Sequence, residues 1–135
     1  MNKVAVFSAL AAAAALTSVS ADAGRRLSPA QQLDKALAGR VAGKPVDCID
    51  PRTNTDTQVI DRTAIIYGSG RTIYVQTPDG ADSLRDDQVL VTELRGSGQL
   101  CSIDVVKLHD RTGGWYEGFV GLNKFVPYTK VAVKD

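Results

Sequence analysis

Several short segments of the chain alternate apolar and polar residues. In 72–77 (TIYVQT), Ile73 and Val75 alternate with threonine, tyrosine and glutamine, and 57–67 (TQVIDRTAIIY) is rich in β-branched residues. A period of two is typical of half-buried strands, and β-branched residues favour extended backbone. The same criteria predict further strands at 88–94, 99–109, 115–122 and 125–133. The pattern therefore predicts a mainly β protein.

Short turns that contain glycine separate these segments. They lie at 68–71 (GSGR), 78–80 (PDG), 95–98 (RGSG) and 110–114 (DRTGG). Short connections of this kind join antiparallel neighbours. We expect a single small antiparallel meander, either a curled sheet or a partly open barrel of five or six strands. Pro127 marks the last segment as an edge strand or a bend, because proline cannot donate to a ladder.

A different period occurs near the N-terminus. Ser28 suits an N-cap, Pro29 the first helical position, and Gln31 the third residue of a capping box. Apolar residues follow at helical spacing, at Leu33, Ala36 and Leu37. A short helix is therefore predicted at 29–38, followed by a loop to residue 47. Its single apolar stripe has to pack on another element.

The first residues have the layout of a secretory signal peptide. Lys3 precedes an apolar run at 4–16, and small residues flank Asp22 at 21–23 (ADA). A membrane anchor is the alternative, but this run is shorter than the roughly 20 residues that span a bilayer. We expect residues 1–23 to be removed and the protein to be periplasmic or secreted. No later run has spanning length, so we expect no stable membrane insertion after cleavage.

The two cysteines, Cys48 and Cys101, then belong to an oxidising compartment, where disulfides persist. Free thiols are one alternative. A redox motif places its cysteines two residues apart, and a structural zinc site takes four ligands, for which the chain adds only His109. We therefore favour a disulfide, with no metal, no cofactor and no catalytic residue. The predicted organisation is a signal peptide (1–23), a helix and loop (24–47) and a disulfide-stapled β domain (48–135).

Charge excludes one class of partner and leaves other chemistry weakly supported. The formal net charge is +1, so the concentrated basic surface of a nucleic-acid binder is not expected. Four aspartates crowd 78–87, but they lack the ligand order of a calcium loop, so a turn is favoured. Carboxylates on the strands could form a glycosidase-like pair by chance, a pattern that carries little information.

Three residues are candidates for a binding surface: His109, Trp115 and Tyr116. Trp115 is the single tryptophan and follows Gly113 and Gly114. Exposed aromatic side chains often anchor partners or stack on sugars. The competing interpretation, which we favour, places Trp115 and Phe119 in the core, because a small core needs its largest side chains.

Parts of the chain resemble a known group of proteins. The segments 48–50 (CID), 59–67 (VIDRTAIIY), 99–104 (QLCSID) and 118–130 (GFVGLNKFVPYTK) are similar to a family of small exported proteins from alphaproteobacteria and related bacteria. The resemblance covers roughly 48–130 and implies an envelope location, with cysteines that serve the fold. That family has no assigned activity, so it implies no catalytic residue here.

These observations favour a non-enzymatic domain that binds an envelope protein or a cell-wall component. Two alternatives stay open. One is a periplasmic hydrolase that uses paired carboxylates on the strands, and the other is a carrier that holds a small apolar ligand inside the barrel.

Export, cleavage and oxidation can be tested together. We expect the denatured protein from its host's periplasm to have the mass of residues 24–135 less two hydrogens, because the signal peptide is removed and one disulfide forms. Intact-mass spectrometry measures this. A full-length precursor with two free thiols would contradict the predicted compartment.

Overall fold

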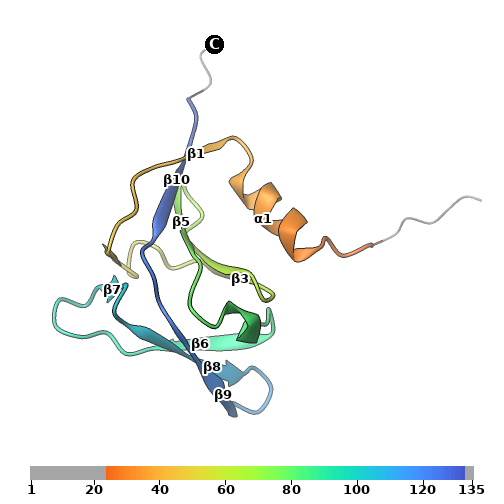
Figure 1. Cartoon of the computed structure of the whole chain (residues 1–135), viewed down its shortest axis with the longest axis vertical. Coiled ribbons are helices and arrows are strands. Elements are labelled where there is room, and N and C mark those ends of the chain that lie inside the picture. The colour runs from red at the N-terminus through yellow and green to blue at the C-terminus, as the bar shows by residue number, and fades with distance from the viewer. Residues whose placement is uncertain (1–23, 133–135) are drawn as a thin grey trace, which may run out of the picture.

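The computed structural model describes residues 24–132, so the expected signal peptide lies outside the described residues. The elements, in chain order, are α1 (Pro29–Leu37), β1 (Arg40–Ala42), β2 (Cys48–Ile49), β3 (Thr57–Ile60), β4 (Ala64–Tyr67), β5 (Thr72–Gln76), the 3₁₀ turn η1 (Ala81–Ser83), β6 (Gln88–Thr92), β7 (Leu100–Cys101), β8 (Val105–Asp110), β9 (Tyr116–Gly121) and β10 (Val126–Lys130) (Figure 1).

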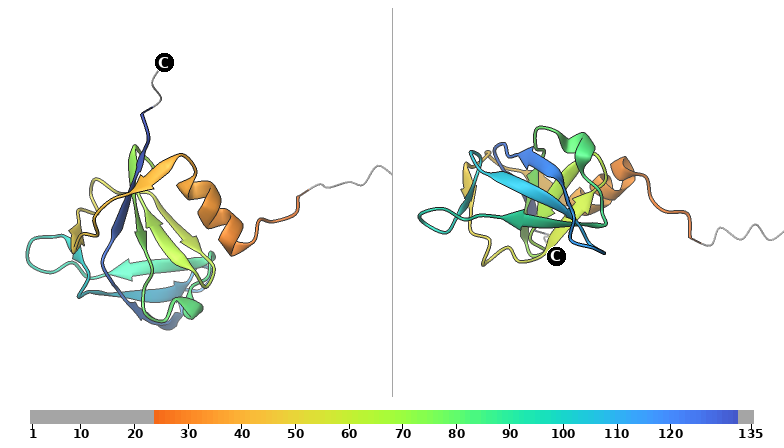
Figure 2. Two further views of the ribbon diagram at one scale, coloured as in Figure 1. Left: turned by 45° about the horizontal axis from the view of Figure 1, so that its top comes forward. Right: turned by 90° about the horizontal axis from the view of Figure 1, so that it is seen from below.

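The strands form three antiparallel sheets. A five-stranded sheet has the order β1-β10-β5-β4-β3, a three-stranded sheet has the order β6-β8-β9, and β2 pairs with β7. Figure 2 shows the strands of the three-stranded sheet running across those of the five-stranded sheet. The predicted mainly β fold with one short helix is confirmed, and none of the sheets closes into a barrel.

Helix α1 covers the outer face of the five-stranded sheet. The Ser28 hydroxyl accepts a hydrogen bond from the Gln31 backbone, and the Gln31 side chain accepts one from the Ser28 backbone, as the capping-box prediction requires. The predicted stripe packs on a second apolar cluster of the sheet, formed by Ile60, Ala64, Ile66, Ile73 and Val75. The helix thus shields from water a sheet face that would otherwise expose several isoleucines and valines.

Because both faces of the five-stranded sheet are covered, strand β4 is buried along its whole length. Ala64 and Ile66 point toward α1, whereas Ile65 and Tyr67 belong to the main core between the two larger sheets. The Tyr67 ring packs edge-on against Phe125, with centroids 5.8 Å apart. A strand covered on both sides shows a continuous apolar run, which explains the sequence AIIY.

The single strand predicted at 57–67 is wrong, because the chain reverses within it. Strands β3 and β4 form a hairpin around Asp61–Thr63, with Arg62 in the left-handed region at a φ of 51°. The Arg62 N–H donates to the Leu84 carbonyl (3.0 Å), and the Asp61 carboxylate accepts from the Asp86 N–H (2.6 Å). This turn contains no glycine, and contacts with a distant segment hold it, so local sequence does not reveal it.

The predicted strand 99–109 also divides, into β7 and β8. The Asp104 carboxylate accepts the Cys101 N–H (2.8 Å), and the Asp104 N–H donates to the Cys101 carbonyl (3.0 Å). This tight local turn ends β7 directly after the cysteine. Cys101 thereby leaves the three-stranded sheet and pairs with β2.

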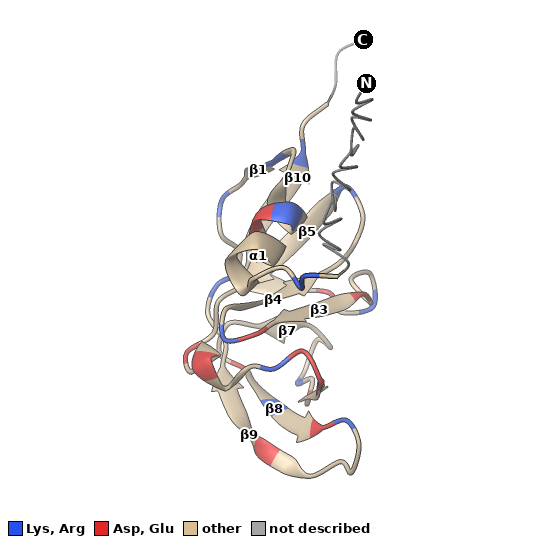
Figure 3. Ribbon diagram, turned by 90° about the vertical axis from the view of Figure 1, so that its right-hand side faces the viewer, with Lys and Arg blue, Asp and Glu red and all other residues tan. Residues whose placement is uncertain are grey.

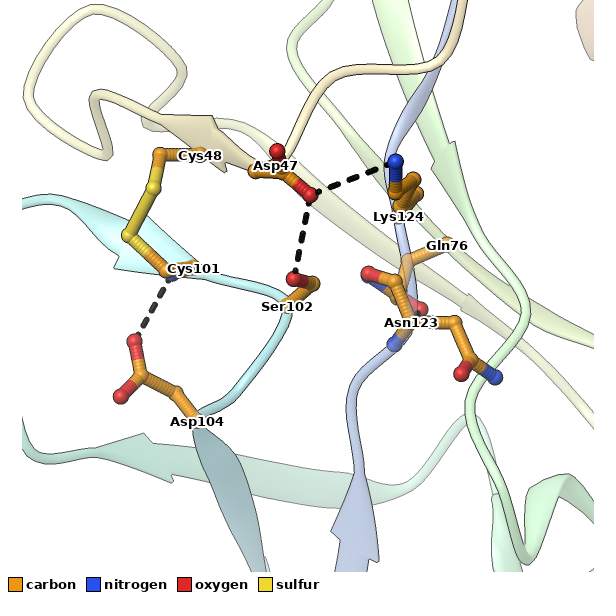
Figure 4. Close-up of a disulfide and its surroundings, with 8 residues drawn as sticks. All are labelled: Asp47, Cys48, Gln76, Cys101, Ser102, Asp104, Asn123 and Lys124. Atoms are coloured by element: carbon orange, nitrogen blue, oxygen red, sulfur yellow. Dashed lines mark hydrogen bonds and ion pairs between the residues drawn. A yellow bond between two sulfur atoms is a disulfide. The ribbon is translucent and has the colours of Figure 1, made fainter.

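The predicted disulfide joins Cys48 and Cys101, which are direct partners in the β2–β7 ladder with Cα atoms 4.0 Å apart. Their neighbours Ile49 and Leu100 are also paired and buried. Beside the bond, the Ser102 N–H donates to the Asp47 carbonyl (2.7 Å), and Lys124 lies 3.7 Å from the Asp47 carboxylate (Figure 4).

Strand β10 is not an edge strand, which corrects the expectation drawn from Pro127. It lies between β1 and β5. Pro127 is just past the end of β1, where its carbonyl accepts the Gly43 N–H (2.7 Å). The Pro127 nitrogen, which cannot donate, also faces the β1 side of β10, beyond the last residue of β1. The ladder between β10 and β5 therefore loses no hydrogen bond.

A buried glutamine links the two larger sheets. The Gln76 side chain, at the end of β5, is fully buried. Its amide donates to the Asn123 carbonyl (2.7 Å) and accepts the Asn123 N–H (2.8 Å). The side chain thus satisfies the backbone groups of Asn123, between β9 and β10, as a neighbouring strand would; Figure 4 shows the two residues. The Asn123 amide in turn donates to the Thr77 carbonyl (2.9 Å).

Removing the disulfide should lower the free energy of unfolding by roughly 4 kcal/mol, because the bond closes a loop of 53 residues in the unfolded chain. The double variant Cys48→Ser/Cys101→Ser and the reduced wild-type protein should unfold at the same, lower urea concentration. Equal midpoints for the double variant and the oxidised protein would show that the bond adds no stability.

Candidate functional site

The three residues predicted for binding lie together on the hairpin of β8 and β9. The rings of His109 and Tyr116 pack edge to face with centroids 5.6 Å apart, and His109 Nδ1 lies 3.0 Å from the Gly114 carbonyl. Trp115 is in the turn between the two strands and is 75% exposed. The structure therefore groups these residues at one end of the three-stranded sheet, with Trp115 and Tyr116 exposed and His109 half-buried.

The favoured burial of Trp115 and Phe119 is wrong. Phe119 is 60% exposed and lies opposite Lys107 on the outer face of the sheet. Its neighbour Val120 points inward and is buried. The core between the sheets is already filled by buried residues from five strands, from the η1–β6 connection and from the β9–β10 connection, including Phe125, so no large side chain is required from the outer face.

The outer face of the three-stranded sheet is apolar. Cross-strand register places Val91, Lys107 and Phe119 in one row, and Val89, His109 and Tyr116 in the next. We call the exposed apolar side chains of this sheet and its turn the apolar face: Val89, Val91, Val105, Trp115, Tyr116 and Phe119. The face that an antiparallel sheet turns to water usually carries polar side chains, whereas this face carries several exposed apolar ones.

One ion pair crosses the apolar face. Lys107 Nζ lies 2.6 Å from the Glu93 carboxylate. The hydrogen bond with Lys107 lowers the pKa of Glu93, and the same bond raises the pKa of Lys107. Each charge thus has its partner within the protein, and the apolar side chains around the pair remain free to contact another molecule.

A second feature, which sequence patterns did not reveal, is a cleft of about 840 Å³ between β3 and β6. We call it the edge cleft. Thr57 and Val59 line one wall, Leu90 and Thr92 line the other, and Tyr67 and Leu100 lie deeper. This volume is in the range of small-molecule sites. No local signal in either strand could have predicted it, because it exists only where two sheets meet.

Tyr67 gives the edge cleft an unusual polar group. The residue is 5% exposed, and its buried hydroxyl has no hydrogen-bond partner among residues 24–132. Burial raises the pKa of Tyr67 well above its usual value, so the hydroxyl keeps its proton. An unsatisfied buried hydroxyl costs free energy.

The strand carboxylates considered for hydrolysis each contact a neighbour of their own. Asp50 binds Arg52 (3.1 Å), and this hydrogen bond lowers the pKa of Asp50. Glu117 accepts from the Gln88 side chain (2.8 Å). The others contact Lys124 (Asp47), the Asp86 backbone (Asp61), Lys107 (Glu93) and the Cys101 backbone (Asp104).

The acidic segment 78–87 forms turns, as predicted. Asp79 accepts from the Asn123 amide (3.2 Å), and its N–H donates to the Gly121 carbonyl (2.8 Å). The 3₁₀ turn η1 begins directly after Gly80. Within residues 24–132, no three histidine, cysteine or acidic side chains gather as metal ligands would.

Within the same range, no helix has the length and apolar composition that would carry it through a bilayer. Acidic and basic residues both occur along the ribbon in the view of Figure 3, with basic residues around β1 and β10. Comparison with family models, curated proteins and solved structures finds no match for this chain. The resemblance to small exported proteins stays a prediction.

The unpartnered hydroxyl yields a test at high pH. Tyr67→Phe should leave the free energy of unfolding unchanged or raise it by up to about 1–3 kcal/mol. In the wild-type protein, the unfolded tyrosine ionises above pH about 10 while the buried one stays protonated, so Tyr67 makes stability fall as pH rises. Above pH 10, the free energy of unfolding should fall less steeply with pH in the variant than in the wild-type protein, and the two slopes should differ by about 1.4 kcal/mol per pH unit. Urea unfolding across pH 9–12 measures the two slopes, and parallel slopes would contradict the assignment.

Proposed function

We propose that the protein is an exported, non-enzymatic domain that binds a partner protein through its apolar face. The observation that carries the proposal is the exposure of Tyr116 and Phe119 beside three valines on one sheet face, with the exposed Trp115 in the adjoining turn. Tryptophan and tyrosine are enriched among the residues that dominate binding energy. Exposed apolar patches on small domains mark interaction sites.

The composition of the apolar face favours a protein over a cell-wall glycan. A glycan presents many hydroxyls, which require free donors and acceptors around a stacking ring. Here Lys107 and Glu93 bind each other, and His109 contacts the Gly114 carbonyl. The rest of the apolar face is made of apolar side chains, and it resembles the core of a protein interface, which is depleted in charged residues.

The rest of the molecule supports a binding role outside the cytosol. The Cys48–Cys101 bond is compatible with a periplasmic or secreted location. The strand carboxylates are spread over separate contacts, which supports binding over hydrolysis. The main core is packed with side chains, so an apolar ligand inside the fold, as a carrier would hold it, has no supporting observation.

Site-specific photo-cross-linking in the native host tests the proposal. A photoreactive residue at position 119 should give one discrete product containing a second protein. The matched control is position 41, because Val41 on β1 is exposed to the same 60% as Phe119. It should give no such product, since β1 belongs to the other large sheet.

Trp115→Ser in the chain carrying the probe should weaken partner binding by about 30-fold, as expected for the loss of a dominant aromatic contact worth about 2 kcal/mol. A product of twice the chain's own mass would replace the proposed partner with self-association. Identical products from positions 119 and 41 would refute a specific surface.

A further inference from the structure

The two larger sheets have four outer edges, and two of them show protection against pairing with another strand. Strand β1 is only three residues long, and its Arg40 side chain folds over the sheet to the Arg71 and Gly70 carbonyls (2.8 and 3.0 Å). The β8–β9 pairing contains a register shift, and β9 carries Gly118 at a φ of 125°. Short edges, charged residues and bulges all hinder unwanted strand addition.

The other two edges, β3 and β6, show none of these features. Their sequences, TQVI and QVLVT, contain no charge, no proline and no glycine. Among the described residues, β3 pairs only with β4, and β6 pairs only with β8. Both unprotected edges line the edge cleft.

Backbone groups on the β3 wall point into the cleft. The Gly68 N–H donates to the Asp56 carbonyl (2.7 Å), which sets the alternation of the β3–β4 ladder. Every second residue of β3 then bonds to β4, and the intervening residues, Thr57 and Val59, direct their N–H and C=O groups away from it.

The same reasoning applies to the β6 wall. The Asp110 N–H donates to the Trp115 carbonyl (2.8 Å), so this residue of β8 bonds toward β9. The alternate residues of β8 bond toward β6, where their register partners are Val89 and Val91. Leu90 and Thr92 therefore direct their backbone groups into the cleft. Outside the strand ladders, these groups form no backbone hydrogen bond within residues 24–132.

The charge of the cleft suits an uncharged occupant. Among the described residues that line it, only Asp86 and Arg111 are charged, with opposite signs. Arg111 contacts the carbonyls of Asp86 and Gln88 (3.4 Å each). Val59, Leu90 and Leu100 offer apolar contact.

We infer that the edge cleft binds an extended, uncharged peptide segment of a partner polypeptide, which adds as a strand to the free edge of β6. The peptide backbone bonds to Leu90 and Thr92, and every second side chain points down toward Val59 and Leu100. The β6 edge has five residues, so the paired segment has about the same length.

A phage-displayed library of random linear peptides, selected on the purified disulfide-bonded protein, tests the inference. We expect enrichment of uncharged sequences that alternate β-branched or apolar residues with polar ones. An N-methyl scan of an enriched peptide should weaken binding at every second position only, because an added strand uses one backbone edge for pairing. This scan leaves the protein unaltered, so folding cannot confound it.

Two protein variants locate the peptide. Thr92→Pro removes a cleft-facing N–H that takes no part in the ladder and should weaken binding about threefold to tenfold, whereas Thr92→Ala keeps that N–H and should bind like the wild-type protein. Val41→Ser, on β1, should cause no loss.

Three results would overturn the inference. They are a selection that enriches no common peptide pattern, enriched peptides whose affinity is insensitive to N-methylation, and equal effects of Thr92→Pro and Val41→Ser. None of them bears on the apolar face, whose cross-linking test stands separately.

Discussion

The disulfide between β2 and β7 is the constraint on which the arrangement of the two large sheets depends. Cys48 lies in the connection between β1 and β3 of the five-stranded sheet, and Cys101 lies in the connection between β6 and β8 of the three-stranded sheet. Strands of two residues have too few ladder bonds to hold together alone. The covalent bond therefore ties a connection of one sheet to a connection of the other, and Leu100 beside it forms part of the edge cleft.

Close to the disulfide, hydrogen bonds also join the two larger sheets (Figure 4). The buried Gln76 side chain pairs with the Asn123 backbone, and the Asp79 N–H donates to the Gly121 carbonyl (2.8 Å). These bonds connect the end of β5 to the end of β9. The edge strands β3 and β6 have no such connection to each other, and the cleft opens between them.

Much of the fold followed from local pattern. The capping box at Ser28, the alternation in 72–77 and the pairing of the only two cysteines each depend on neighbouring residues or on simple counting, and the structure confirms them. The reversal at Arg62 and the central place of β10 depend on distant partners, the Leu84 carbonyl and strand β1. One-dimensional patterns do not contain those partners.

The candidate sites divide in the same way. The cluster of His109, Trp115 and Tyr116 was visible as unusual composition near a glycine turn, but its exposure was not. Whether Phe119 points in or out depends on the register shift in the β8–β9 pair, which no propensity predicts. The cleft was invisible for a different reason: TQVI and QVLVT look like ordinary strands, and their unpaired edges become apparent only when the neighbours are known.

Two uncharged strand edges around one opening also affect how the free protein behaves at high concentration. Any extended segment can pair with such an edge, including a strand from another copy of the same chain. The empty molecule is then the state most prone to aggregate, and an occupant of the cleft keeps it dispersed by covering those edges. Partner abundance would thereby set how much of this protein a cell compartment can hold in usable form.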